Sequence, residues 1–128
     1  MRVLLDTSAY SALARSNQEI YDILSLATEV FIPSIALGEL LSGFYGGSRR
    51  AENVAELESF LEKPSVKVLQ VTAETALHYA QVDQFLRRKG KPIPRNDVWI
   101  AAIAIKHGLQ LVVIDKHFRE IPMLLLRP

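Results

Sequence analysis

The sequence predicts one α/β domain over residues 1–128, a three-layer α/β/α sandwich with a central, mainly parallel sheet. Short apolar runs rich in Val, Ile and Leu recur along the chain, and helical patterns lie between them. The runs are continuous rather than alternating, which is typical of strands covered on both faces. Strands that alternate with helices form right-handed crossover units, so we expect the strands to run in parallel. No repeat, low-complexity tract or Pro/Gly-rich linker divides the chain.

The expected strands follow from the apolar runs, and the first run leads directly into Asp6. In chain order, we expect strands at residues 3–5, 30–32, 66–71, 111–114 and 123–126.

The expected helices carry their own start and stop signals. The stretch "SNQE" at residues 16–19 has the pattern of a capping box in front of Ile20. Ser34 is placed to cap the next helix, and Gly90 and Gly108 are placed to end the last two. After the helix that starts near residue 20, we expect helices at residues 35–44, 49–61, 72–89 and 96–107. The last, "NDVWIAAIAIKH", is apolar almost all round and should be buried.

Composition limits the possible functions. The chain is 49% hydrophobic and 23% charged, as in folded proteins, and no window approaches the ~18 uninterrupted apolar residues of a membrane span. It has no cysteine, which excludes disulfides and thiolate metal sites and fits a reducing cytosol. We therefore expect a cytoplasmic protein with no secretory signal and no membrane partner. The net charge of +1 indicates no partner, so contacts with nucleic acid must come from local basic residues.

Four of the acidic residues interrupt apolar segments, whereas the others lie in polar surroundings that solvated helix faces or turns explain. Asp6 follows the first strand, and Asp115 follows "LQLVVI". Glu39 lies within "SIALGELL", and Asp97 begins the apolar helix. These four positions are therefore the candidates for a site.

The predicted topology brings the four side chains to one edge of the sheet. In a parallel sheet, strand ends and the starts of the following helices share the edge where ligands collect. Carboxylates that converge there repel one another, and a hard divalent cation such as Mg²⁺ or Mn²⁺ is the usual compensation. The sequence therefore predicts a metal site at this edge, with Asp6 as one of its ligands.

Three of the candidates also have a structural explanation, whereas Glu39 is harder to dismiss because its apolar neighbours indicate a helix with little exposed face. Asp6 and Asp115 are residue types common in turns, and Asp97 would complement the start of a helix. His117 lies near the last acid in sequence and faces either the site or, as we expect, solvent. Without cysteine, and without histidines paired at i and i+4, a zinc site is not expected.

Four segments in series resemble the PIN domain, in particular the VapC-type ribonuclease toxins of prokaryotic toxin–antitoxin pairs. They are "VLLDTSAY", "IPSIALGELLSG", "NDVWIAAIA" and "LVVIDKHFREIP", and they span nearly the whole chain. The resemblance implies a PIN-like sandwich and an endoribonuclease that depends on Mg²⁺, with Mn²⁺ as a substitute. It also implies a homodimer held inactive by a cognate antitoxin. Apolar helix surfaces around residues 20–26 and 54–61 favour a homodimer as well.

The resemblance also assigns roles to individual residues. Ser8 matches a hydroxyl that supports the first acid. Two residues before the last acid, Val113 stands where the family often has Thr or Ser, so a potential hydrogen bond is lost and the role of that acid is open. The residues given catalytic and metal-binding roles are Asp6, Glu39, Asp97 and Asp115.

The expected reaction is hydrolysis of an RNA phosphodiester with one or two divalent ions. Arg95, Lys116 and Arg119 are expected near the same edge and are the candidates for contacts with RNA phosphates. The basic run at residues 87–91 is either a second patch or the solvated end of a helix that complements its dipole.

Other functions with a similar architecture stay open at this point. The nearest is a PIN nuclease that works in RNA processing without an antitoxin. A receiver-like signalling domain has a similar acidic Mg²⁺ pocket but needs an Asp at the end of the third strand, which reads "VLQVTAE". A haloacid-dehalogenase-like phosphatase needs a second Asp at the position of Ser8. A non-enzymatic protein-binding module with a structural ion is the last alternative.

Overall fold

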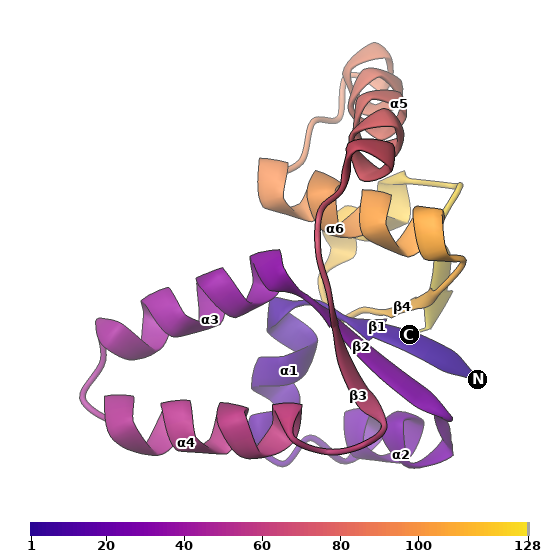
Figure 1. Ribbon diagram of the computed structural model, residues 1–128. Coiled ribbons are helices and arrows are strands. Elements are labelled where there is room, and N and C mark those ends of the chain that lie inside the picture. Colours follow the sequence, from indigo (N-terminus) through magenta and orange to yellow (C-terminus); the bar gives the residue numbers. More distant parts are fainter. Residues whose placement is uncertain (128) are drawn as a thin grey trace.

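Five parallel strands form the single sheet of this protein, which the computed structural model describes over residues 1–127. The strands are β1 (Arg2–Leu5), β2 (Glu29–Pro33), β3 (Val66–Leu69), β4 (Gln110–Val112) and β5 (Leu125–Arg127). The helices are α1 (Thr7–Ala14), α2 (Gln18–Leu26), α3 (Ser34–Tyr45), α4 (Arg50–Leu61), α5 (Ala73–Lys89) and α6 (Arg95–His107), with a 3-10 turn, η1 (Lys116–Glu120). Figure 1 shows their arrangement. The α/β class and the five expected strands are confirmed, and residue 128 lies outside the described residues.

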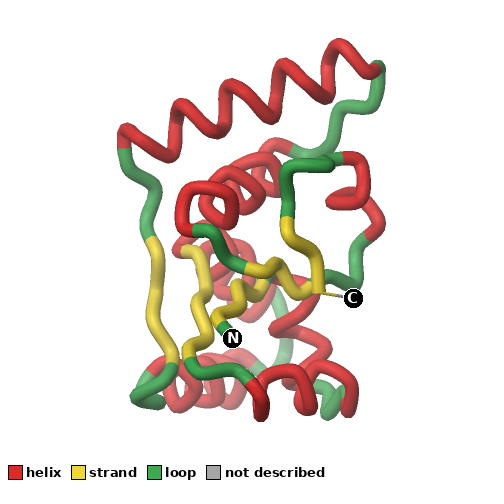
Figure 2. Tube along the Cα trace, turned by 90° about the vertical axis from the view of Figure 1, so that its right-hand side faces the viewer, coloured by secondary structure: helices red, strands yellow, loops and turns green. Residues whose placement is uncertain are grey.

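Two apolar cores, one on each face of the sheet, explain the continuous hydrophobic runs. Successive side chains of a strand point to opposite faces. Accordingly, Val3 and Leu5 of β1 pack with α1 to α4, whereas Leu4 packs with α5 and α6. All three are fully buried. In Figure 2 helices lie above and below the strands, which confirms the three-layer sandwich.

In the strand order β3-β2-β1-β4-β5, the winding of the chain along the sheet reverses between β1 and β4, although the two strands run parallel. The chain first winds from β1 to β2 and β3 with α1 to α4 on one face, and then crosses to β4 with α5 and α6 on the other face. Open parallel sheets bind ligands at such a switch point, outside the carboxyl ends of the strands. The topology therefore selects the edge at the ends of β1 and β4 for a site.

The helix ends differ from the local expectations in two places. The capping residue of α2 is Asn17, whose side chain accepts a hydrogen bond from the helix backbone at 3.1 Å, and not Ser16. Ser34 is the first residue of α3 rather than its cap. Gly90 and Gly108 end α5 and α6 in the left-handed conformation, as expected.

The sequence pattern does not predict α1, an eight-residue helix that begins directly after Asp6. In addition, β3 and β4 end at Leu69 and Val112, before their apolar runs do. The residue after β4, Val113, is nevertheless buried in the core beneath α6. None of the helices in residues 1–127 is long and apolar enough to cross a membrane.

Candidate metal centre

The four candidate carboxylates lie near one another where β1, β2 and β4 end, and within residues 1–127 only Asp97 and Asp115 of the four belong to the compact group of possible metal ligands. Asp6 directly follows β1, and Asp115 follows β4 after a short connection. Glu39 lies on α3, which begins at the end of β2, and Asp97 lies in the first turn of α6. The helices α3 and α6 contact each other, and Figure 1 shows their first turns beside the strand ends. The acids therefore occupy the edge that the topology selects.

Asp6 is buried, with 3% of its surface exposed. Its side chain accepts a hydrogen bond from the Ala9 backbone N–H at 2.8 Å and so caps α1. The pKa of Asp6 is raised from 3.8 to about 6. Burial is the largest cause, the bond from Ala9 opposes it, and repulsion from the other three carboxylates adds to it. Asp6 is thus both a capping residue and a member of a cluster of like charges.

Glu39 reaches the cluster from α3 and is held by a hydroxyl of α1. The Thr7 Oγ1 hydroxyl donates a hydrogen bond to Glu39 Oε1 at 2.6 Å. The family resemblance assigns Ser8 to support Asp6, whereas the hydroxyl contact in the structure runs from the neighbouring Thr7 to a different acid, Glu39. Nothing in "DTS" distinguishes the two hydroxyls, because the choice depends on how the first turn of α1 is oriented.

His117 joins the cluster, while 47% of its side chain stays exposed to solvent. Its ring nitrogen Nδ1 lies 3.1 Å from Asp97 Oδ2 and 3.2 Å from Asp115 Oδ1. The His117 backbone N–H also donates to Asp115 Oδ1 at 2.9 Å, so that Asp115 caps η1. One ligand atom from each of these three side chains lies within 4.8 Å of the others, a spacing that suits a single metal ion.

A weak signal for His117 is present in the segment "DKHF". An Asp two residues earlier can cap a short turn. Phe118, the next residue, is apolar within a polar run and is fully buried in the structure. The contact with Asp97 comes from a distant element and could not be predicted locally.

Asp97 is held by contacts outside its own helix. Burial raises the pKa of Asp97, the hydrogen bond with His117 lowers it, and the nearby charges of Asp115 and Glu39 raise it again, so that the net shift is upward. Pro94 occupies the cap position of α6, and Asp97 lies inside the first turn. The expectation that Asp97 complements the start of α6 therefore explains its position in the first turn. It does not explain the contact of its carboxylate with His117.

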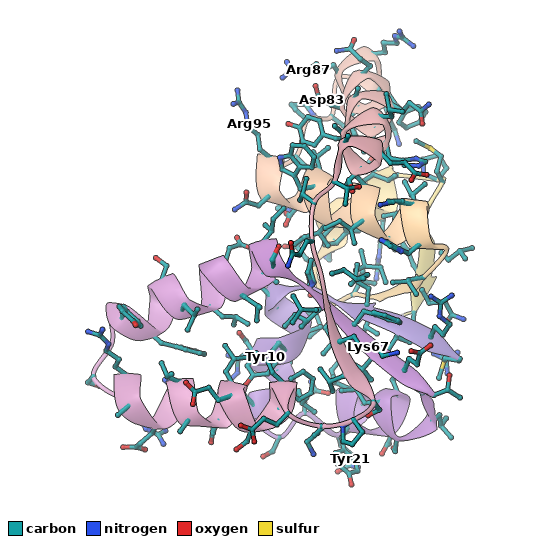
Figure 3. The ribbon with its side chains drawn as sticks, in the orientation of Figure 1. Tyr10, Tyr21, Lys67, Asp83, Arg87 and Arg95 are labelled. Carbon is teal, nitrogen blue, oxygen red and sulfur yellow. The ribbon has the colours of Figure 1, made fainter. Side chains whose placement is uncertain are left out.

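Three basic residues flank this edge. Arg95 opens α6, and Figure 3 shows its side chain extending away from α3. Lys116 and Arg119 lie on η1, on either side of His117. All three are exposed, and within residues 1–127 they form no ion pair. They are therefore free to contact a polyanion.

The second basic patch, in residues 87–91, is partly neutralised by the chain itself. Arg87 pairs with Asp83 at 2.9 Å, as Figure 3 shows on α5. Lys89 pairs with Glu120 at 2.9 Å. These pairs favour the interpretation of this run as a solvated helix end.

An open cleft with a volume of about 610 Å³ lies beside the acids. It is lined by Ile35, Gly38, Glu39, Ser42 and Asn96, from α3 and the first turn of α6. A flexible chain can therefore approach the carboxylates from solvent. Convergent carboxylate oxygens at an accessible edge can hold a hard divalent cation against such a substrate.

Comparison with known proteins identifies the family. Residues 3–124 match the family model of the PIN domain. The chain belongs to the PIN-domain family. This PIN domain is 28% identical over 131 residues to ribonuclease VapC2 of Rickettsia felis, with 98% of this chain and 96% of the relative covered. It is 31% identical over 122 residues to the tRNA(fMet)-specific endonuclease VapC of Salmonella typhimurium, covering 94% and 89%.

Solved structures show the same fold. A crystal structure of VapBC2 from Rickettsia felis, bound to a DNA fragment from their promoter, matches this PIN domain with a TM-score of 0.89 at 29% identity. The match covers 99% of this chain and 98% of that one. The resemblance of the four sequence segments to PIN domains is therefore confirmed, and the receiver-like and phosphatase alternatives do not apply.

Proposed function

We propose that this PIN domain is a VapC-type endoribonuclease that hydrolyses RNA phosphodiester bonds as the toxin of a toxin–antitoxin pair. One observation carries the proposal, namely that four carboxylates from distant parts of the sequence converge at the switch-point edge of the sheet. Relatives named ribonuclease or endonuclease support the reaction. The residues proposed as catalytic and metal-binding are Asp6, Glu39, Asp97 and Asp115.

A divalent cation fits the groups that are present. The carboxylates repel one another, and within residues 1–127 no lysine or arginine forms an ion pair with them. Their hard oxygen donors suit Mg²⁺, and Mn²⁺ is proposed as a substitute because it accepts the same ligands. When bound, such an ion stabilises negative charge on the attacked phosphate and makes water a better nucleophile.

The chain itself positions the carboxylates before any substrate binds. The backbone of α1 holds Asp6 through the bond from Ala9, and the Thr7 hydroxyl holds Glu39. Groups fixed in this way need little reorganisation during the reaction, which is the main source of electrostatic catalysis. We therefore expect the acidic edge to keep its arrangement whether or not RNA is present.

Phosphate contacts are proposed for Arg95, Lys116 and Arg119, which are exposed and lie on the elements that carry Asp97 and His117. Such contacts fix the register of a nucleic acid but do not read its bases. Their removal should weaken binding about equally for all RNA sequences and reduce the dependence of binding on salt.

Two protein partners complete the proposal. A cognate antitoxin is supported by the Rickettsia felis neighbour, which is a VapBC assembly. A homodimer is supported by Tyr21 and Leu26 of α2, which are 60% and 68% exposed. Leu57 and Phe60 of α4 are buried, so the apolar surface available for a dimer lies on α2 rather than on both helices. An RNA substrate supports the proposal of a cytoplasmic location.

The direct test is cleavage of single-stranded RNA by the full chain. We expect cleavage with Mg²⁺ or Mn²⁺ and none in EDTA. Asp6→Asn removes a charge but keeps the shape and the capping bond, and we expect a loss of about 100-fold or more. Glu58→Gln, which removes one charge from the exposed surface of α4, is the control and should cleave like wild type. Undiminished cleavage by Asp6→Asn would contradict the assignment of the site.

Two further measurements test the partners. We expect the adjacent reading frame to encode a small DNA-binding protein. Expression of the chain should arrest growth, and co-expression of that protein should relieve the arrest. A nuclease of RNA processing would show neither effect. Sedimentation at high micromolar concentration should show a dimer, and a monomer alone would contradict the homodimer.

A further inference from the structure

The imidazole of His117 has no part in the reaction as described so far, yet it faces two of the carboxylates. Its Nδ1 atom lies 3.1 Å from Asp97 Oδ2 and 3.2 Å from Asp115 Oδ1. We propose that this nitrogen is itself a metal ligand, so that the cation lies in a mixed nitrogen–oxygen site with these two carboxylates. The inference rests on the proposed function, because it concerns the same metal centre.

The two distances fit neighbouring ligands of one octahedral ion. Bonds of about 2.1 Å at right angles place two ligand atoms about 3.0 Å apart. A hydrogen bond has a similar length, but Nδ1 carries at most one proton and cannot fully satisfy two carboxylates. A cation on the same atoms satisfies the nitrogen and both carboxylates together. The convergence of two acids on one nitrogen therefore favours a shared ligand set.

The fold holds the backbone of His117 at this position from both sides. The His117 backbone N–H is bound to Asp115, the cap of η1, at 2.9 Å. The next residue, Phe118, is fully buried in the core beneath α6. Because 47% of the His117 side chain is exposed, the ring also stays accessible to an ion arriving from solvent.

A nitrogen ligand has a consequence for ion preference. Mg²⁺ binds through oxygen donors, whereas imidazole nitrogen raises the affinity for first-row transition ions. The site should therefore bind Mn²⁺ more tightly than Mg²⁺, and this preference should depend on His117.

The test is pulsed EPR of Mn²⁺ bound to the full-length protein, which detects ¹⁴N coordinated directly to the ion. We expect this coupling in wild type and in His78→Gln, a control on α5, and its loss in His117→Gln. Mn²⁺ affinity should fall about tenfold or more in His117→Gln, and Mg²⁺ affinity should change much less. Gln keeps an amide that can donate to one carboxylate, so a role limited to hydrogen bonding would leave both affinities near those of wild type.

The outcomes separate this inference from the proposed function. If Mn²⁺ binds and supports cleavage but the wild-type spectrum lacks nitrogen coupling, the inference is overturned and the nuclease assignment stands. Coupling that persists in His117→Gln overturns the inference as well. If the protein binds neither Mn²⁺ nor Mg²⁺, the proposed function fails and the inference fails with it. The wild-type spectrum alone can overturn the inference, so the test does not depend on the stability of the variant.

Discussion

At the sheet edge where the strands begin, a carboxylate is paired with cations of the chain, whereas the carboxylates at the edge where the strands end are not, in the part of the chain that the structure describes. At the edge where the strands begin, Glu29 lies 2.7 Å from the Lys67 ammonium and 3.5 Å from Arg2. The hydrogen bond from Lys67, together with both positive charges, lowers the pKa of Glu29. At the edge where the strands end, four carboxylates converge, and within residues 1–127 their only ion-pair partner is His117. There the pKa of Asp6 is raised to about 6.

The difference shows at which edge the chain itself neutralises the negative charge. At the first edge Arg2 and Lys67 pair with Glu29, so no bound metal ion is needed there to balance its charge. At the second edge the like charges are held together by backbone and hydroxyl contacts but are not neutralised by the chain. Repulsion of this kind is relieved by a bound cation. The acidic edge is therefore arranged for binding rather than for the stability of the metal-free protein.

The largest expected contrast is in RNA cleavage by a pair of matched glutamate variants. Glu39→Gln removes one charge from the acidic edge but keeps an oxygen that can accept the Thr7 bond. We expect cleavage to fall by about 100-fold. Glu29→Gln makes the same chemical change at the opposite edge, and cleavage should stay close to wild type. Equal losses in the two variants would show that the edges do not differ in function.

The second contrast is in the pH dependence of stability, measured in EDTA. The pKa of Asp6 rises from 3.8 to about 6 on folding, so between these values the unfolded chain releases a proton that the folded chain keeps. The contribution of Asp6 to the free energy of unfolding therefore falls as pH rises through this window, by up to about 3 kcal/mol in total. Asp6→Asn, which keeps the cap and cannot ionise, should lack this fall.

The control for the pH experiment is Glu29, whose pKa is shifted in the other direction. Its lowered pKa means that its stabilising contribution is present above its ordinary pKa and is lost as pH falls. The free energies of unfolding of wild type and Glu29→Gln should thus converge toward acid pH. Those of wild type and Asp6→Asn should diverge as pH rises from 4 to about 6. Chemical denaturation at a series of pH values gives both differences. If the difference in free energy of unfolding between wild type and variant changed with pH in the same direction for both variants, the comparison would be contradicted.

The smallest expected effect is that of salt on the paired edge. Exposed ion pairs contribute little and are screened by salt. The loss of stability in Glu29→Gln should be small at low ionic strength and should vanish in ~1 M salt. The loss of cleavage in Glu39→Gln should remain at any ionic strength that still permits RNA binding. A large, salt-independent loss of stability in Glu29→Gln would contradict the surface character of these pairs.

The architecture and the acidic edge could be predicted from the sequence because both follow from long-range rules. Apolar runs buried on both faces indicate a parallel sheet, and a parallel sheet gathers its strand ends at one edge. Asp6 and Asp115 could therefore be placed near each other although they are far apart in the chain. Glu39 and Asp97 could be placed at the same edge because the starts of the following helices lie there.

The contacts within the site depend on geometry that the sequence pattern does not contain. Whether Thr7 or Ser8 reaches an acid depends on the orientation of one helical turn. The position of His117 depends on a short turn that is anchored by Phe118 and capped by Asp115. Its contact with Asp97 joins that turn to a separate helix. The contacts of Thr7 with Glu39 and of His117 with Asp97 join separate elements, and local propensity does not determine them.

The central claim, that the acidic edge carries charge that only a cation balances, is tested most directly by the thermal unfolding of Asp97→Asn. In EDTA the variant has one charge less at nearly constant volume, so it should melt at or above the wild-type temperature, although a lost charge near the start of α6 offsets part of the gain. Mg²⁺ at about 100 times its dissociation constant stabilises wild type by roughly 2.7 kcal/mol, a rise of about 5–15 °C, and the variant should gain much less. If Asp97→Asn melts well below wild type in EDTA and still gains fully from Mg²⁺, then Asp97 only supports its helix and the account of this edge is wrong.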